Sequence, residues 1–182
     1  DKTATNVIGY FHQNIFRYFP NCVVPREGWD VIVTQKDGTK IYVEMKNKHN
    51  TMNAASSQKT YIQMQNQIMQ TPNDFCFLVE AIAPCSRNIP WGCSVNKIHC
   101  EHAHIRRVSM DQFYAIVTGE TTAFFEMCMQ LPKTIEKIVR QNRNLTVQKD
   151  TVLEELQQMH PDLQIALYQL AFATYDGFSL LK

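Results

Sequence analysis

The sequence predicts an α/β protein of the α+β type, in which a mixed β-sheet is flanked by helices and the C-terminal half is helical. Three observations predict this class: two alternating strand-like segments over 29–46, a continuous apolar run over 74–82, and helix-period segments from 109 onward. With 182 residues, 45% of them hydrophobic, the chain is long enough for one buried core. We therefore expect a single domain over 1–182, with a core over about 4–107 followed by the helical region.

Composition and charge limit the classes of function that this chain could have. The formal net charge is only +1, yet residues 133–149 carry five basic side chains against one acidic, and residues 40–59 carry four lysines against one glutamate. Such local basic zones suit a phosphate backbone. No apolar run approaches the roughly 20 residues that span a bilayer, and six scattered cysteines predict free thiols. We expect a cytoplasmic protein without membrane contact. Because the chain starts without Met, we also expect that a natural N-terminal segment precedes it.

The first predicted helix covers residues 4–19. Apolar side chains recur at helical spacing from Ile8 to Phe19, and Pro20 then ends the helix. The amide of Gln13 lies along this helix, where a polar face beside the core is the simplest interpretation.

Residues 29–46 predict a β-hairpin around which the rest is organised. Asp37 and Gly38 form a favoured tight-turn pair between two strand-like runs, so Asp30 at the start of the first strand comes near Glu44 on the second. Side chains alternate along a strand with period two. One face of the second strand carries Tyr42, Glu44 and Lys46, and the other carries Ile41, Val43 and Met45. We expect the apolar face to enter the core and the charged face to meet solvent or substrate.

A polar loop over 47–51 is predicted to leave the second strand and to lead into a helix. That helix begins near Asn53 and ends before Pro72, with apolar positions from Tyr61 to Met69 at a 3.6-residue period. Backbone N–H groups at a helix start favour anions such as phosphate. The loop and first turn are therefore expected to face whatever occupies the charged face of the hairpin.

The remaining chain is predicted to be a buried strand, an irregular stretch and a series of helices. Residues 74–82 predict a strand buried on both faces, and residues 84–107 predict an irregular stretch with one or two short strands after Val95. Ser109 and Gln112 predict a capping box on a helix that ends near Gly119. Further helices are predicted over 121–131, from Pro132, from Thr151 and from Pro161.

The charged face of the hairpin carries the chemistry of a metal-dependent phosphodiesterase. Magnesium prefers oxygen ligands, and Asp30 and Glu44 supply two carboxylates. The ion would polarise the scissile phosphate, and Lys46 would position the attacking water or neutralise charge on the phosphorane. The alternative is a solvated salt pair on an exposed strand face, which is common for an acid and a lysine two residues apart.

A second constellation of zinc-type ligands lies in the irregular stretch. Its members are Cys85, Cys93, His99, Cys100, His102 and His104. Because no CxxC or HxxxH pair is present, we expect ordinary buried thiols and strand-face histidines here, and not a structural zinc.

Several stretches carry a resemblance to a known family. Gly28-Trp29-Asp30 followed by Glu44-Met45-Lys46 resembles the signature of the PD-(D/E)XK nuclease superfamily, with Trp29 where proline is usual. GYFHQNIF (9–16), VEMKNKHNTMNAASSQKTYIQMQ (43–65) and FYAIVTGETTAFFEMCMQLPKTI (113–135) are more specific. They resemble a group of Type II restriction endonucleases that cleave GGNCC or GGWCC sequences, over most of the chain from Gly9 to about Ile138.

The resemblance implies a magnesium-dependent homodimer that cuts both strands of a short palindrome in double-stranded DNA. It further implies a bacterial cytoplasm and a cognate DNA methyltransferase as functional partner. Asp30, Glu44 and Lys46 carry over as the catalytic triplet, and Asp30, Glu44 and the backbone carbonyl of Met45 as the metal ligands. Trp29 does not disturb these roles, because the replaced proline shapes a turn and ligates no metal. Gln13 lies where related folds sometimes place an extra acid, and its amide would contact a metal-bound water.

Contacts with DNA are expected close to this triplet. Guanine O6 and N7 favour Arg or Lys, while at least half of protein–DNA hydrogen bonds go to phosphate and sugar. The candidates are Asn47, Lys48, His49, Asn50, Gln58, Lys59, Arg106 and Arg107, with Arg87 as a further candidate for guanine.

Two other functions remain open at this point. A structure-directed repair or junction nuclease of the same fold would also need metal, but would cut without a discrete fragment pattern. A non-catalytic DNA-binding module would bind DNA with the triplet serving only as a surface ion pair, and metal dependence would distinguish it from both nucleases.

Overall fold

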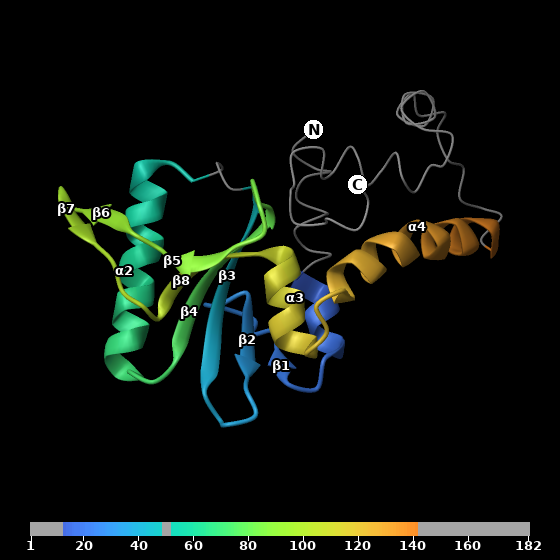
Figure 1. Cartoon of the computed structure of the whole chain (residues 1–182), viewed down its shortest axis with the longest axis horizontal. Coiled ribbons are helices and arrows are strands. Elements are labelled where there is room, and N and C mark those ends of the chain that lie inside the picture. The colour runs from blue at the N-terminus through green and yellow to red at the C-terminus, as the bar shows by residue number, and fades with distance from the viewer. Residues whose placement is uncertain (1–12, 49–51, 142–182) are drawn as a thin grey trace.

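The computed structural model describes residues 13–48 and 52–141, and a six-stranded sheet lies at its centre (Figure 1). The strands of this sheet follow the order β1-β2-β3-β4-β8-β5. Their bounds are β1 Cys22–Val23, β2 Val31–Thr34, β3 Lys40–Lys48, β4 Phe75–Ile82, β8 Ile105–Ser109 and β5 Asn88–Pro90. A separate two-stranded ribbon consists of β6 Cys93–Val95 and β7 Ile98–Cys100. The helices are η1 Phe16–Tyr18, α2 Ala54–Gln70, α3 Met110–Thr118 and α4 Ala123–Gln141.

The sheet is mixed, as the sequence predicts. β1, β2 and β3 pair antiparallel, β3, β4 and β8 pair parallel, and β5 returns antiparallel to β8. The parallel pairing of β3 with β4 needs a crossover, and α2 supplies it. β4 is buried along almost its whole length, because helices cover both faces of the sheet at this strand.

Each face of the sheet has its own apolar core. One core joins Val43 and Val79 of the sheet to Phe113 of α3, and Phe16 and Phe124 pack into the same cluster. The other core lies under α2. It contains Tyr61, Met64, Ile68, Cys76, Leu78, Trp91 and Ile105, with Tyr42 packed against it. The expectation that the face of Tyr42 meets only solvent or substrate is therefore wrong for the first half of β3, which α2 covers.

The hairpin turn and the ends of two helices follow the local sequence signals. Gly38 has φ +87°, and the Thr39 N–H donates to Asp37 Oδ1 over 2.9 Å, which closes the turn between β2 and β3. Asn53 caps α2, because its side-chain oxygen accepts from the Ser56 N–H over 2.8 Å. Gly119 ends α3 in the left-handed region, with φ +81°.

Two further predictions about local structure are wrong. β3 continues through Asn47 and Lys48, which therefore belong to the strand and not to a loop, since β4 still pairs alongside them. Ser109 is the N-cap of α3 but makes no capping box, because its hydroxyl donates to Asp111 and Gln112 donates to Ser86.

A fourth difference concerns residue 132, where a new helix was predicted to begin. α4 is one helix over Ala123–Gln141 and continues through that position. The apolar positions before and after residue 132 keep one helical period, and this common face favours a continuous helix over a break.

The irregular stretch also contains more strand than predicted, namely β5, β6, β7 and β8. The start of the first predicted helix and the two helices predicted from Thr151 and Pro161 lie outside the described residues. None of the helices in the described part combines the length and apolar character needed to cross a membrane.

Candidate active site

Strand β3 positions two of the predicted residues side by side. Glu44 and Lys46 lie two residues apart on one face of β3, and Lys46 Nζ donates to Glu44 Oε1 over 2.7 Å. Their side chains are 20% and 29% exposed, so the ion pair is half-buried and accessible from outside. A substrate can therefore reach both groups without any rearrangement of the sheet.

Asp30 is held beside this pair by the end of the antiparallel ladder. Its N–H donates to the Val43 carbonyl over 2.9 Å, and β2 begins only at the next residue. Two residues further along β3, the Met45 N–H has no backbone partner on β2, because the pairing of β2 with β3 ends at Val31 and Val43. This N–H donates to Asp30 Oδ2 over 2.7 Å. Gln13 Nε2 donates to Oδ1 over 3.1 Å. Two N–H groups thus fix the orientation of the Asp30 carboxylate.

The environment of Asp30 disfavours its charged form. Burial raises the pKa of the Asp30 carboxyl above its usual value, and the nearby negative charge of Glu44 raises it further. The hydrogen bond from the Met45 N–H and the positive charge of Lys46 act in the opposite direction and lower the pKa. Two carboxylates that repel each other at close range form a site that a divalent cation would relieve.

The main chain of Met45 adds a third oxygen on the same side. In a strand, the N–H and C=O of one residue point toward the same neighbouring strand. Because the Met45 N–H points to Asp30, the Met45 carbonyl faces the Asp30 side of β3 as well. The predicted ligand set of Asp30, Glu44 and the Met45 carbonyl is therefore brought to one end of the hairpin, and all its donors are hard oxygens.

The start of α2 and the adjoining end of β3 flank this site. Gln58 is in the second turn of α2 and donates through Nε2 to Asn96 Oδ1 in the β6–β7 turn, over 3.0 Å. Lys59 is exposed on the same helix. Lys48 is exposed at the end of β3 and Asn47 is half-buried before it. His49 and Asn50 lie outside the described residues.

Two neighbouring arginines, Arg106 and Arg107, point to opposite faces of the sheet. Arg107 is in register with Leu78 and, through it, with Glu44, so it lies on the face of the candidate site. Arg106 lies on the other face, where its guanidinium is bonded to Asn88 and to the Ala103 carbonyl. The structure therefore brings Arg107 toward the site but not Arg106.

Sequence reasoning missed a buried carboxylate next to the site. Glu80 on β4 is in register with Lys46, is 1% exposed, and is bonded to the guanidinium groups of Arg87 and Arg107. A signal was present, since an acidic residue inside a continuous apolar strand requires a buried partner. The identity of that partner depends on contacts distant in the sequence.

Among the cysteine and histidine constellation, Cys93 and Cys100 are half-buried, whereas His99 and His102 are exposed. Cys93 and Cys100 are free thiols that face each other across the β6–β7 ribbon. His104 stacks on Phe75, with ring centroids 4.3 Å apart. Within residues 13–48 and 52–141, no three His, Cys, Asp or Glu side chains are grouped so that they could hold a metal ion.

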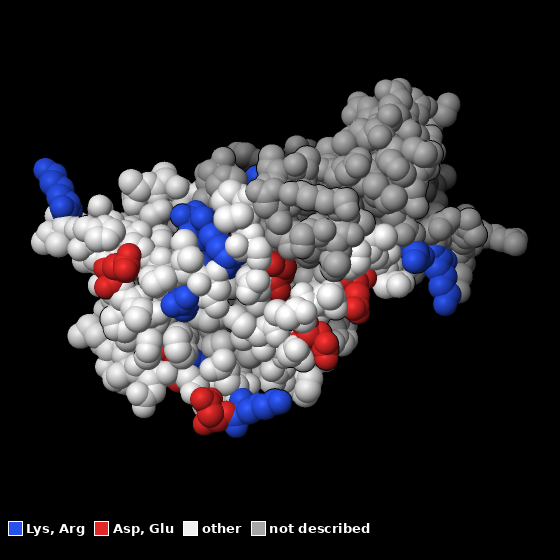
Figure 2. Space-filling view, in the orientation of Figure 1, with Lys and Arg blue, Asp and Glu red and all other residues white. Residues whose placement is uncertain are grey.

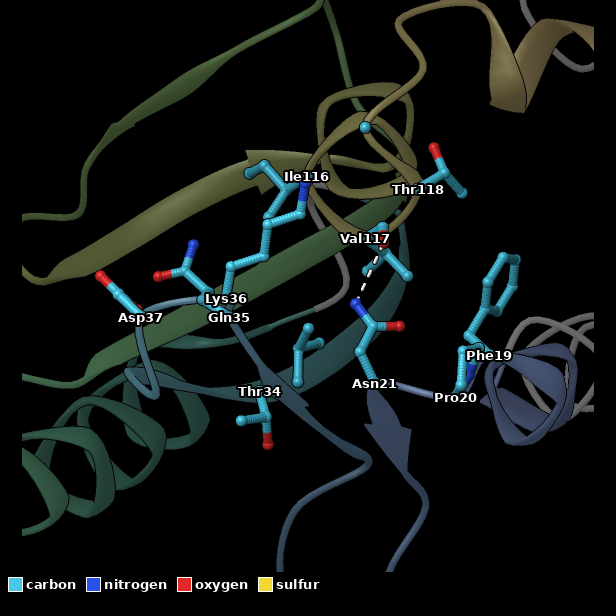
Figure 3. Close-up of a pocket in the computed structure, with 12 residues that line it drawn as sticks. Phe19, Pro20, Asn21, Thr34, Gln35, Lys36, Asp37, Ile116, Val117 and Thr118 are labelled. Carbon is cyan, nitrogen blue, oxygen red and sulfur yellow. Dashed lines mark hydrogen bonds between the residues drawn. The ribbon is translucent and has the colours of Figure 1, made fainter.

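A separate pocket lies at the opposite end of β2 from Asp30 (Figure 3). Its volume is about 850 Å³, and it is lined by residues 19–21, 33–37 and 116–119. Asn21 Nδ2 donates to the Val117 carbonyl over 3.1 Å across the wall of this pocket.

In the view of Figure 2, basic side chains (blue) and acidic side chains (red) are interspersed over the described surface, in keeping with the low net charge.

The fold and the family agree. The mixed sheet with flanking helices has the architecture expected of a restriction endonuclease. A family model described as Eco47II restriction endonuclease matches residues 1–140, and the chain belongs to that family. The predicted resemblance to Type II restriction endonucleases is thereby confirmed.

One curated relative is the Type II restriction enzyme Sau96I of Staphylococcus aureus. It is 29% identical over 151 residues, which cover 79% of this chain and 58% of the relative. The chain thus spans less than two thirds of the length of that relative. No solved structure matches this chain significantly.

Proposed function

We propose that the protein is a Type II site-specific deoxyribonuclease that hydrolyses phosphodiester bonds in double-stranded DNA. The observation that carries this proposal is the grouping of Asp30, Glu44 and Lys46 at one end of the hairpin, inside the region matched by the restriction endonuclease family. The earlier resemblance supports a short palindrome of the GGNCC or GGWCC type as the site. It also supports the assignment of the core to the PD-(D/E)XK superfamily.

The donor set fits magnesium. Asp30, Glu44 and the Met45 carbonyl offer only oxygen atoms, and two carboxylates are a typical protein contribution to a Mg²⁺ site. When bound, the ion would polarise the scissile phosphate and lower the pKa of a water. Burial raises the pKa of the Asp30 carboxyl and the charge of Glu44 raises it further, and a bound cation would offset both effects.

Lys46 contributes the positive charge that the chemistry needs. Its ammonium is held 2.7 Å from Glu44 Oε1 and keeps further N–H donors for a water or a phosphate oxygen. From this position it orients the attacking water or neutralises charge that builds on the phosphorane. Glu44 thereby serves two neighbours, since it both orients Lys46 and supplies a metal ligand.

The rest of the proposal concerns the assembly and its surroundings. Cleavage of both strands of a palindrome calls for two copies of the site related by a two-fold axis, so we propose a homodimer. The DNA contacts proposed near the site come from the end of β3, the start of α2 and Arg107. We further propose a cytoplasmic location and a cognate DNA methyltransferase that protects the host genome.

The experiment is digestion of a sequenced phage genome with the full-length protein, with and without Mg²⁺, followed by sequencing of the fragment ends. We expect Mg²⁺-dependent ends that cluster at GGNCC or GGWCC. Lys46→Ala should abolish cutting while specific DNA binding persists. Lys40→Ala is the matched control, because Lys40 is exposed at the other end of the same strand and should be replaceable without loss.

The other outcomes identify the rival functions. Mg²⁺-dependent cuts at scattered positions would replace the proposal by a structure-directed nuclease. DNA binding without any cutting under all conditions would replace it by a non-catalytic module.

A further inference from the structure

Glu80 is a buried carboxylate shared by two guanidinium groups. Its side chain is 1% exposed, its Oε1 accepts from Arg107 Nε over 2.6 Å and from Arg107 Nη2 over 2.5 Å, and its Oε2 accepts from Arg87 Nη2 over 2.5 Å. Burial of a carboxylate is costly, and partners with good geometry are needed to offset it. Here the two arginines supply those partners.

This cluster adjoins the candidate active site on the same face of the sheet. Lys46, Glu80 and Ser109 are in register on β3, β4 and β8, and Glu44 and Arg107 are in register through Leu78. Neighbouring strands lie about 4.8 Å apart, so the backbone of Arg107 is about 10 Å from that of Glu44. A substrate phosphate at Glu44 and Lys46 therefore has the two guanidinium groups close to it.

The backbone that carries Arg87 is fixed as well as its side chain. The Arg87 N–H donates to Ser109 Oγ over 2.9 Å, and the Ser109 N–H donates to the Arg87 carbonyl over 2.9 Å. Asp111, at the start of α3, accepts from the Ser109 and Ser86 hydroxyls. The segment before β5 is thus tied to the sheet and to α3, and it presents Arg87 in one orientation.

The two guanidinium groups keep part of their surface open to solvent. The Arg87 and Arg107 side chains are 17% and 27% exposed, whereas Glu80 between them is 1% exposed. The Arg87 Nε is buried and has no hydrogen-bond partner among the described residues. An anion that approaches this face therefore meets the guanidinium groups and not the carboxylate that holds them.

We propose that Glu80 is a positioning residue that holds Arg87 and Arg107 as a fixed fork for a backbone phosphate next to the scissile one. The inference rests on the proposed nuclease function and deepens it. A phosphate fits this position better than a base. Both guanidinium groups are bonded to Glu80 close to the sheet surface, and Glu44 and Lys46, which must contact a phosphate, lie on the same surface. A base edge inside a groove lies further from that surface.

The first test compares Glu80→Gln with the wild type in DNA affinity and in cleavage rate at saturating DNA. Removal of a negative charge makes the surface more positive, so a mere counter-ion role predicts equal or tighter DNA binding. The proposal predicts the reverse, an affinity loss of about tenfold with the rate at saturation almost unchanged. Lys36→Ala is the control, because Lys36 is exposed in the turn at the other end of the hairpin from Asp30 and should leave the affinity unaltered.

The second test locates the phosphate. In duplexes with a single neutral methylphosphonate, one position next to the cleaved bond should weaken wild-type binding, and the same substitution should have little further effect on Arg107→Ala. Lys keeps the charge but loses the planar fork, so Arg107→Lys should itself bind more weakly. The slope of log affinity against log salt should also fall by about 1 in Arg107→Ala.

Each result supports or overturns the proposal. If Glu80→Gln folds and binds DNA as tightly as the wild type or more tightly, the proposal is overturned. It is also overturned if no methylphosphonate position depends on Arg107, and that result would indicate that Arg107 contacts a base. If Glu80→Gln fails to fold by circular dichroism, the Arg107→Lys variant and the scan decide alone. Failure of the nuclease function itself would be seen separately, as wild-type protein that never cuts at a discrete site.

Discussion

The two faces of strands β3, β4 and β8 differ sharply, although they alternate residue by residue. Toward α3 the strands present Val43, Val79 and Val108, which are buried in a continuous apolar core with Phe113. Toward α2 the same strands present Glu44, Glu80 and Arg107. At these positions the α3 face holds only apolar side chains, whereas the α2 face combines its own apolar core with the ionised groups.

The charged face is possible because α2 covers only part of it. The apolar side chains of α2 begin at Tyr61 and form one cluster with Tyr42 and Leu78. Glu44, in register with Leu78, and Lys46 beyond it stay half-buried. A shift of β3 by one residue would move these charges into the α3 core, so the register fixes both the fold and the site.

On the charged face, Glu44→Gln should have a large effect, second only to the loss of cutting expected for Lys46→Ala. The variant removes a proposed metal ligand and the partner of Lys46, so we expect a loss of cleavage rate of about 10³-fold, together with weakened Mg²⁺ binding. Glu120→Gln, on an exposed position between α3 and α4, is the control and should behave like the wild type. Calorimetric titration with Mg²⁺ and single-turnover cleavage provide the measurements. An unchanged Mg²⁺ affinity would contradict the role of Glu44 as a ligand.

The largest effect on the apolar face should come from Phe113→Ala. Phe113 is fully buried and packs against Phe16 with tilted rings whose centroids are 4.9 Å apart, so truncation leaves a cavity in the α3 core. We expect the free energy of unfolding to fall by about 3–5 kcal/mol, measured by urea denaturation. Met69→Ala, at an 80% exposed position, should change it by less than about 0.5 kcal/mol. A loss of activity without a loss of stability in Phe113→Ala would break the division between the two faces.

The alternation of side chains along the strands made part of the difference between the two faces predictable from sequence. The hairpin, its Asp37-Gly38 turn and the two ends of α2 depend on residues close in sequence, and the structure shows each of them as predicted. Because the alternation of side chains along β3 follows from geometry, the pairing of Glu44 with Lys46 on one face could be derived without any tertiary contact.

The other part depends on contacts distant in sequence. Glu80 is hidden in the apolar run of β4, and its partners Arg87 and Arg107 lie 7 and 27 residues away. Nothing local indicates that Arg107 faces the site and Arg106 does not, since the register of β8 is set only by its pairing with β4 and β5. The strands β5 to β7 contain three residues each and are too short to show a period.

Acidic pH should have a smaller, graded effect through Asp30. The pKa of Asp30 is raised by burial and by Glu44, so the folded protein binds this proton more readily than the unfolded chain. The resulting stability is fully present below the unfolded-state pKa and is lost as the pH rises through the folded-state pKa. In metal-free protein, the unfolding free energy of the wild type relative to Asp30→Asn should therefore decrease as the pH is raised through this window. Mg²⁺ affinity should follow the opposite trend, because the metal needs the ionised carboxylate. A difference between wild type and Asp30→Asn that is independent of pH would exclude a raised pKa.

The smallest effect is expected at Gln13, which orients Asp30 from outside the sheet. Its amide donates to Asp30 Oδ1 over 3.1 Å, while the Met45 N–H holds the other oxygen. Gln13→Ala leaves the second hydrogen bond in place, so we expect a cleavage rate about tenfold lower and a stability loss of about 1 kcal/mol. Asn14→Ala, at the exposed neighbouring position, is the control. Because only the orientation of a ligand changes, a higher Mg²⁺ concentration should restore most of the rate in Gln13→Ala. In Glu44→Gln it should restore only the part of the loss that comes from weaker Mg²⁺ binding. Wild-type rates in Gln13→Ala at limiting Mg²⁺ would show that the Met45 N–H alone suffices to hold Asp30. The charged face would then not need the hydrogen bond from Gln13.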